Sequence, residues 1–157
     1  MTFGRLQWLF PFALTVHNAE EAIWMPSWDA RHTAELPGHP PGAFAFRIAL
    51  GVLTLAAFVL TYLCARRGRQ SVWSYLVFGS IVAMLANVLV PHVAAAIMFH
   101  GYVPGVVTAV LINLPLMSLL AVKAVSGGWV SGWRAVASGI GVPLVIGGSI
   151  LTWLRLH

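Results

Sequence analysis

A histidine and two glutamates lie close together near the amino terminus, in the run VHNAEEAIW at 16–24. On a helix, His17 is one turn from both Glu20 and Glu21, so the three side chains share one side. With His92 they offer the nitrogen and oxygen ligands that zinc or iron takes in sites between facing helices. We therefore predict a metal site formed by His17, Glu20, Glu21 and His92, with His100 as a further ligand if two metals bind.

The same residues permit chemistry without a metal. In apolar surroundings a carboxylic acid can serve as a proton donor near neutral pH, so Glu20 or Glu21 would act as the acid and the other glutamate or His17 as the base. This would suit an isomerase or a cyclase. The residues also fit a small proton-coupled transporter, an accessory subunit or a purely structural hydrogen-bond network between helices.

The composition indicates a membrane protein. The 157 residues are 59% hydrophobic and 8% charged, whereas soluble domains are roughly 25% charged. Apolar runs near the roughly 20 residues that cross a bilayer occupy 6–25, 46–65, 72–99, 104–125 and 134–154. We predict an all-α fold, a polytopic membrane bundle of about five transmembrane helices that forms one domain over 1–157.

Basic residues at the span ends predict the orientation, because cytoplasmic loops hold the excess of Lys and Arg. With the N-terminus inside and the C-terminus outside, six are cytoplasmic: Arg5, Arg66, Arg67, Arg69, Lys123 and Arg134. Three are external: Arg31, Arg47 and Arg155. The net charge of +5 is therefore mostly a topology signal, and we expect no nucleic-acid partner and no nucleotide cofactor. A prokaryotic cytoplasmic membrane is the expected location.

Polar side chains from the first, third and fourth spans reach one depth. At about 1.5 Å per residue, five of them fall in the outer half of the bilayer: His17, Glu21, Asn87, His92 and Asn113. A charged group at the bilayer centre costs roughly 2.5–3.5 kcal/mol, so these residues must face the bundle interior. We predict a site there for a lipidic or prenyl-like small molecule. The expected substrate contacts are Asn87, Tyr102, Asn113 and Trp24.

Two further segments carry predictions. The connection between the first two spans has 20 residues without a secondary-structure signal, and such long loops are often lids. Its residues 33–41 would form the lid, with four side chains over the outer mouth of the site: Trp24, Trp28, Arg31 and His32. The small residues of SGIGVPLVIGGS at 138–149 indicate close helix packing or a contact face in a homo-oligomer.

Three motifs in order resemble the HXXEE family of small membrane proteins. HNAEE at 17–21 is followed by His92 and, ten residues later, by YVPG at 102–105, with Thr108 and Pro115 beyond. The resemblance covers roughly residues 8–120 and implies no reaction. It does imply that these positions matter: His17, Glu20, Glu21, His92, Tyr102, Pro104 and Gly105. Four residues separate Asn87 from His92 where the family pattern has three, and a bulge at Pro91 would restore the facing of Asn87.

Overall fold

The computed structural model describes residues 1–32 and 42–156, and every regular element in those residues is a helix. The short α1 (Phe3–Leu6) precedes α2 (Leu9–His32), which is followed by α3 (Ala43–Arg67). The third apolar run forms α4 (Val72–Asn87), the π-helix η1 (Val88–Val93) and α5 (Ala94–Met98). The fourth forms α6 (Val106–Thr108), the π-helix η2 (Ala109–Asn113) and α7 (Leu114–Ser126), and the fifth forms α8 (Gly132–Leu156). The predicted all-α class is confirmed.

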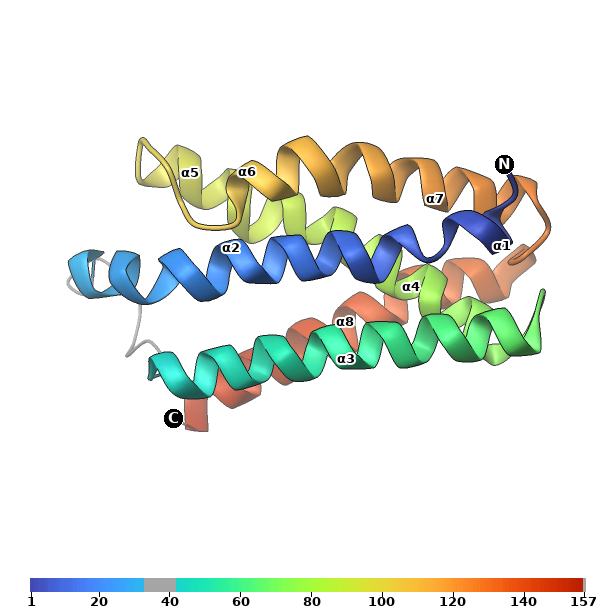
Figure 1. Ribbon diagram of the computed structural model, residues 1–157, viewed down its shortest axis with the longest axis horizontal. Coiled ribbons are helices and arrows are strands. Elements are labelled where there is room, and N and C mark those ends of the chain that lie inside the picture. Colours follow the sequence, from blue (N-terminus) through green and yellow to red (C-terminus); the bar gives the residue numbers. More distant parts are fainter. Residues whose placement is uncertain (33–41, 157) are drawn as a thin grey trace.

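Helix α2 carries the HNAEE motif and lies between two neighbouring helices. In Figure 1 it lies with α3 on one side and the α6–η2–α7 helix on the other, and these elements contact it. Helix α8 packs against α4. The chain begins at one end of the bundle and α8 ends at the opposite end (Figure 1).

Apolar side chains form the core of the bundle and also cover much of its outer surface. Large apolar residues are exposed along the outer faces, for example Leu55 on α3, Leu111 on η2 and Leu144 on α8. Polar side chains are instead buried, including His17, Asn18, Thr61, Ser74, His92, Thr108 and Asn113. A bundle surrounded by lipid requires this arrangement, since polar groups in a bilayer must face protein.

Among residues 1–32 and 42–156, three helices are long and apolar enough to cross a membrane, by length and composition: Ala43–Arg67, Val72–Met98 and Val106–Ser126. They coincide with the second, third and fourth predicted spans. The helices at the first and fifth positions, α2 and α8, have 24 and 25 residues.

Helix α2 extends further than the apolar run from which it was predicted. It continues through Pro26 to His32, so Trp28 and Arg31 belong to the helix and not to a loop. The added turns are held by Trp28, whose ring packs edge-on against Phe99 with centroids 4.9 Å apart and whose Nε1 donates to the Tyr102 carbonyl at 3.1 Å. Tertiary contacts thus offset the backbone hydrogen bond that Pro26 lacks.

Part of the small-residue segment of α8 packs closely against α4 of the same chain. A Cβ added to Gly79 of α4 would lie 2.5 Å from the Ser138 carbonyl oxygen and 2.7 Å from the Val142 Cβ of α8. The two backbones therefore approach so closely that a side chain at Gly79 cannot fit without a shift. Further along, an added Cβ on Gly147 or Gly148 meets nothing within 4 Å.

Candidate functional site

Three of the four predicted metal ligands meet inside the bundle. The Glu21 Oε1 lies 3.4 Å from the Nε2 of His92 and 3.9 Å from the Nε2 of His17. One ligand atom from each residue lies within 4.8 Å of the others. The two imidazole rings cross edge to face with centroids 4.7 Å apart. Both histidines are buried, and Glu21 is the partly exposed member of this cluster, which we call the His/Glu cluster.

The π-helix η1 brings Asn87 and His92 to the same cluster. In a regular α-helix, residues five apart are rotated by about 140°, so they would point to different sides. The helix is instead kinked within η1, where Val90 has a non-helical conformation (φ −133°, ψ 116°) before Pro91, and the kink changes the direction in which the following residues face. The Nδ2 of Asn87 consequently lies 3.3 Å from the Nε2 of His17.

Glu20 has a different role from its neighbour Glu21. Its Oε1 accepts a hydrogen bond from the Tyr102 hydroxyl at 2.8 Å, and its Oε2 accepts one from the backbone N–H of Thr108 at 3.0 Å. Glu20 therefore joins α2 to the YVPG segment and to the beginning of the next helix, where a free backbone N–H favours a carboxylate. It lies outside the His/Glu cluster, which contains Glu21.

Gly105 allows the YVPG segment to pass directly over the two imidazoles. Its φ is +90°, and an added Cβ would lie 2.4 Å from the Cε1 of His92 and 3.1 Å from the Cε1 of His17. Both the backbone conformation and the space thus require glycine at this position. The YVPG motif therefore packs against His17 of the HNAEE motif and against His92.

Thr108 is the residue that sequence reasoning did not place in the site. Its Oγ1 lies 2.8 Å from the Nδ1 of His17, and its backbone N–H binds Glu20. The side chain is buried. Its position three residues after Gly105 was a usable signal, because a helix that begins after a turn points its first N–H groups and side chains back at that turn.

The remaining predicted residues lie at differing distances from the cluster. Asn113 is fully buried on η2, and within the described part of the chain neither atom of its side-chain amide has a hydrogen-bond partner. Trp24 is 54% exposed on α2 and does not enclose the buried histidines. His100 is exposed after α5, outside the His/Glu cluster.

An aromatic group closes the end of α2 beside the site. The rings of Trp28 and His32 stack with centroids 4.2 Å apart, and Phe99 packs edge-on against both. Through its bond to the Tyr102 carbonyl, Trp28 also fixes the YVPG segment. The predicted lid, 33–41, lies outside the described residues.

The Tyr102 phenol is held in its protonated form. Partial burial, the hydrogen bond to Glu20 and the charge of that carboxylate raise the pKa of Tyr102 to about 12. The hydroxyl therefore remains a donor to Glu20 through the neutral pH range.

The fold and the site together define a small protein whose described part is helical, with three helices there suited to crossing a membrane and a histidine–glutamate cluster against which the YVPG segment packs. Residues 8–120 match the family described as a protein of unknown function with HXXEE motif, and the chain belongs to this family.

The chain is also similar to a protein of Bacillus subtilis (strain 168) named "Uncharacterized protein YrkK". The two are 31% identical over 111 residues, which cover 71% of this chain and 69% of that protein. No solved structure matches the chain.

Proposed function

We propose that the protein is a membrane-embedded, metal-dependent enzyme that acts on a lipidic or prenyl-like small molecule. The observation that carries the proposal is the buried meeting of His17, Glu21 and His92. Two imidazoles and one carboxylate are the protein ligands of several catalytic zinc sites, in which the fourth position stays open for water or substrate.

The donor set fits a metal of this kind. Around a tetrahedral zinc, with bonds of about 2.0–2.2 Å, neighbouring ligand atoms are about 3.4 Å apart. The Glu21–His92 pair already has this spacing at 3.4 Å, whereas His17 Nε2 and Glu21 Oε1 are 3.9 Å apart. The three ligand atoms spread over up to 4.8 Å, so the side chains must draw together to share one metal. Within the described residues neither buried ring nitrogen of His92 makes a well-formed hydrogen bond, and its Nε2 has the longer contact of 3.4 Å to Glu21. A buried polar atom without a partner is costly unless a ligand binds it.

The contacts divide the two glutamates between two tasks. Glu21 would hold the metal, together with His17 and His92. Glu20 would position the YVPG segment, since both of its oxygens are engaged by Tyr102 and Thr108. When bound, zinc or iron would polarise a substrate oxygen or an attached water. Asn87, 3.3 Å from His17, is the side chain best placed to contact a polar group of the substrate.

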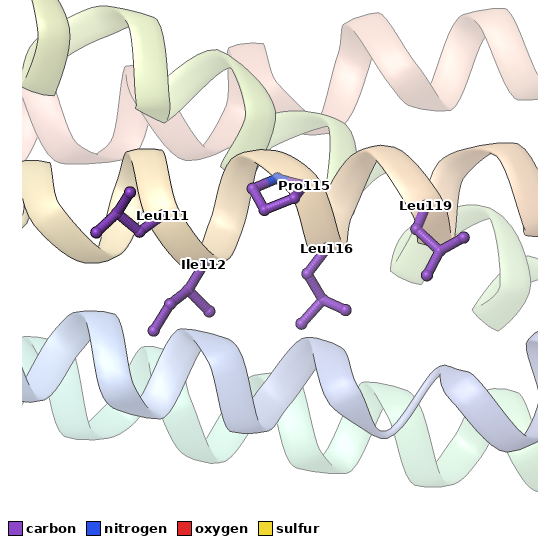
Figure 2. Close-up of a pocket in the computed structure, with 5 residues that line it drawn as sticks. All are labelled: Leu111, Ile112, Pro115, Leu116 and Leu119. Carbon is purple, nitrogen blue, oxygen red and sulfur yellow. The ribbon is translucent and has the colours of Figure 1, made fainter.

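An apolar groove supports a substrate with a hydrocarbon chain. It has a volume of about 330 Å³ and is lined by Leu111, Ile112, Pro115, Leu116 and Leu119. In Figure 2, Ile112 and Leu116 point from η2 and α7 towards the blue α2 ribbon. Ile112 follows Thr108 by one helical turn, so one end of the groove lies a turn from the residue that contacts His17. The groove is shallow and largely open, so a chain lying in it would be covered on one side only.

For the topology we propose five spans, with the N-terminus inside and the C-terminus outside a prokaryotic cytoplasmic membrane. The opposite placement of the chain's beginning and the end of α8 (Figure 1) supports an odd number of crossings. The excess of Lys and Arg at the cytoplasmic ends supports the orientation. The similarity to a Bacillus subtilis protein supports a bacterial location.

Metal analysis of the purified protein, solubilised in detergent, tests this proposal. We expect about one zinc or iron per chain in the wild type and loss of that metal in His17→Ala and His92→Ala. His100→Ala is the matched control, because His100 is exposed and lies outside the cluster. Glu21→Gln should lose the metal, whereas the neighbouring Glu20→Gln should retain part of it. A wild-type protein that binds no metal after incubation with zinc or iron refutes the proposal.

A second candidate is favoured by the contact between Glu21 and His92 at 3.4 Å. A carboxyl and an imidazole at this distance can exchange a proton, so the pair could serve as the acid and base of an isomerase or a cyclase. This candidate requires activity in metal-free protein, with Glu21→Gln inactive and Glu20→Gln only weakened. Activity lost on chelation and restored by zinc or iron would exclude it.

A further inference from the structure

The Thr108 hydroxyl stands between His17 and the backbone of the YVPG segment. Its Oγ1 lies 2.8 Å from the Nδ1 of His17 and 3.2 Å from the carbonyl oxygen of Gly105. All three groups are buried. The same carbonyl accepts the backbone N–H of Ala109 at 2.8 Å, which leaves one of its two lone pairs for the hydroxyl.

The direction of these bonds follows from the number of hydrogens. A carbonyl oxygen only accepts, so the 3.2 Å contact is a hydrogen bond only when the single hydrogen of the Thr108 hydroxyl points to Gly105. With that hydrogen turned to His17, two acceptor oxygens would face each other, so the first arrangement is the one that satisfies both contacts. The hydroxyl oxygen can then only accept from His17, which must carry its proton on Nδ1. We propose that Thr108 is a positioning residue that holds neutral His17 in the Nδ1–H tautomer and leaves the Nε2 lone pair directed into the His/Glu cluster.

The other ring nitrogen agrees with this assignment. The Nδ2 of Asn87, an N–H donor, lies 3.3 Å from the Nε2 of His17. A donor in that place requires an acceptor on the ring, and only an unprotonated Nε2 provides one. Contacts from two different helices therefore point to the same tautomer.

The inference deepens the proposed function and rests on it for its metal-binding consequence. A histidine that binds a metal through one nitrogen almost always donates the other N–H to a fixed acceptor, which sets the tautomer and the ring orientation. Here the acceptor would be Thr108, relayed to the Gly105 carbonyl. The tautomer itself stands on the hydrogen-bond geometry and needs no metal.

Nitrogen NMR of histidine-labelled protein, freed of metal with a chelator, tests the assignment directly. The spectra are recorded at alkaline pH, where imidazole is neutral, and His17→Gln identifies the His17 signals by their loss. The pattern of coupling between ring nitrogens and ring C–H protons shows which nitrogen carries hydrogen. Two variants separate the hydroxyl from the side-chain shape: Thr108→Ser keeps the hydroxyl, and Thr108→Val keeps the branched shape without it. Both retain the backbone N–H that binds Glu20.

We expect the Nδ1–H form in the wild type and in Thr108→Ser, and a rise of the Nε2–H form in Thr108→Val. Zinc affinity should fall about 10–100-fold in Thr108→Val and recover in Thr108→Ser. An Nε2–H tautomer in the wild type overturns the inference, even if Thr108→Val does not fold. If wild-type protein binds no metal but its tautomer follows the hydroxyl, the proposed function fails and this inference stands. If zinc binds but the tautomer of His17 is the same in Thr108→Val as in the wild type, this inference fails and the proposed function stands.

Discussion

Gly105→Ala is the substitution that most directly tests the close packing of the YVPG segment on the two histidines. The new Cβ would lie 2.4 Å from the Cε1 of His92, 2.9 Å from its Nδ1 and 3.1 Å from the Cε1 of His17. Both rings are buried, so neither can move aside without disturbing its neighbours. Alanine would also have to adopt a φ of +90°.

Two costs add at this position. A left-handed conformation costs a residue with a Cβ about 1–2 kcal/mol, and overpacking a filled interior costs about 1–3 kcal/mol. We therefore expect Gly105→Ala to lower the free energy of unfolding by about 2–5 kcal/mol. Gly128→Ala is the matched control, because Gly128 also has a positive φ, +66°, but nothing lies within 4 Å of its added Cβ. It should lose only the conformational part, about 1–2 kcal/mol.

Unfolding of both variants in the same detergent, followed by circular dichroism, gives the difference between them. Metal content measured on the folded fraction shows whether displacement of the rings also impairs the site, and we expect Gly105→Ala to lose metal while Gly128→Ala retains it. Equal destabilisation of the two variants would refute the close contact between Gly105 and the imidazoles. Unchanged metal binding in Gly105→Ala would show that these rings do not need their present positions.

Two further predictions concern helix packing and the Tyr102–Glu20 contact. Gly79→Ala places a Cβ 2.5 Å from a backbone carbonyl of α8 and should cost about 1–3 kcal/mol of stability. Gly51→Ala is the control, because an added Cβ there meets nothing within 4 Å, and it should be neutral or slightly stabilising. Equal losses of stability in the two variants, measured by thermal unfolding, would contradict the close crossing of α4 and α8. The pKa of Tyr102 is raised to about 12, so the associated stability is present below pH 10, the ordinary tyrosine value, and is lost as the pH rises towards 12. The difference in alkaline absorbance between wild type and Tyr102→Phe should show this midpoint, Glu20→Gln should lower it, and an unmoved midpoint would argue against the contact.

Much of the architecture follows from simple length and periodicity. Apolar runs near 20 residues predict long helices, and the cost of a charge in lipid predicts that His17 and His92 face inward. Their meeting could be anticipated because both fall at one depth. The rotation of each helix about its axis could not, since it depends on how all neighbouring side chains pack.

This rotation decides the division between Glu20 and Glu21. Adjacent helical residues differ by about 100° in direction, so both were equally good ligand candidates from spacing alone. The choice depends on Tyr102 and Thr108, which engage Glu20 from a segment more than eighty positions away in the sequence. Contacts of that range leave no local pattern in the sequence.

The orientation of the Asn87 side chain shows a second limit of prediction from sequence. The presence of Pro91 predicts an irregularity, but not how many residues it absorbs. The kink at Val90 and Pro91 changes the direction of the helix, and Asn87 lies within 3.3 Å of His17. The length of α2 shows the same dependence on distant contacts, since its last turns are held by Trp28 against Phe99 and Tyr102.

The three motifs act as one structure because each supplies what another lacks. The helix that carries His17 and Glu21 has no means of fixing the imidazole tautomer, and the acceptor comes from Thr108, just beyond YVPG. The YVPG segment, in turn, is held against the rings by Glu20 and can approach them only because Gly105 has no Cβ. A change in any one motif should therefore alter the geometry at the other two. For the same reason, loss of the Glu20 contacts should disturb the geometry around Glu21 and His92 without removing either side chain, so we expect metal binding in such a variant to be weakened and not abolished.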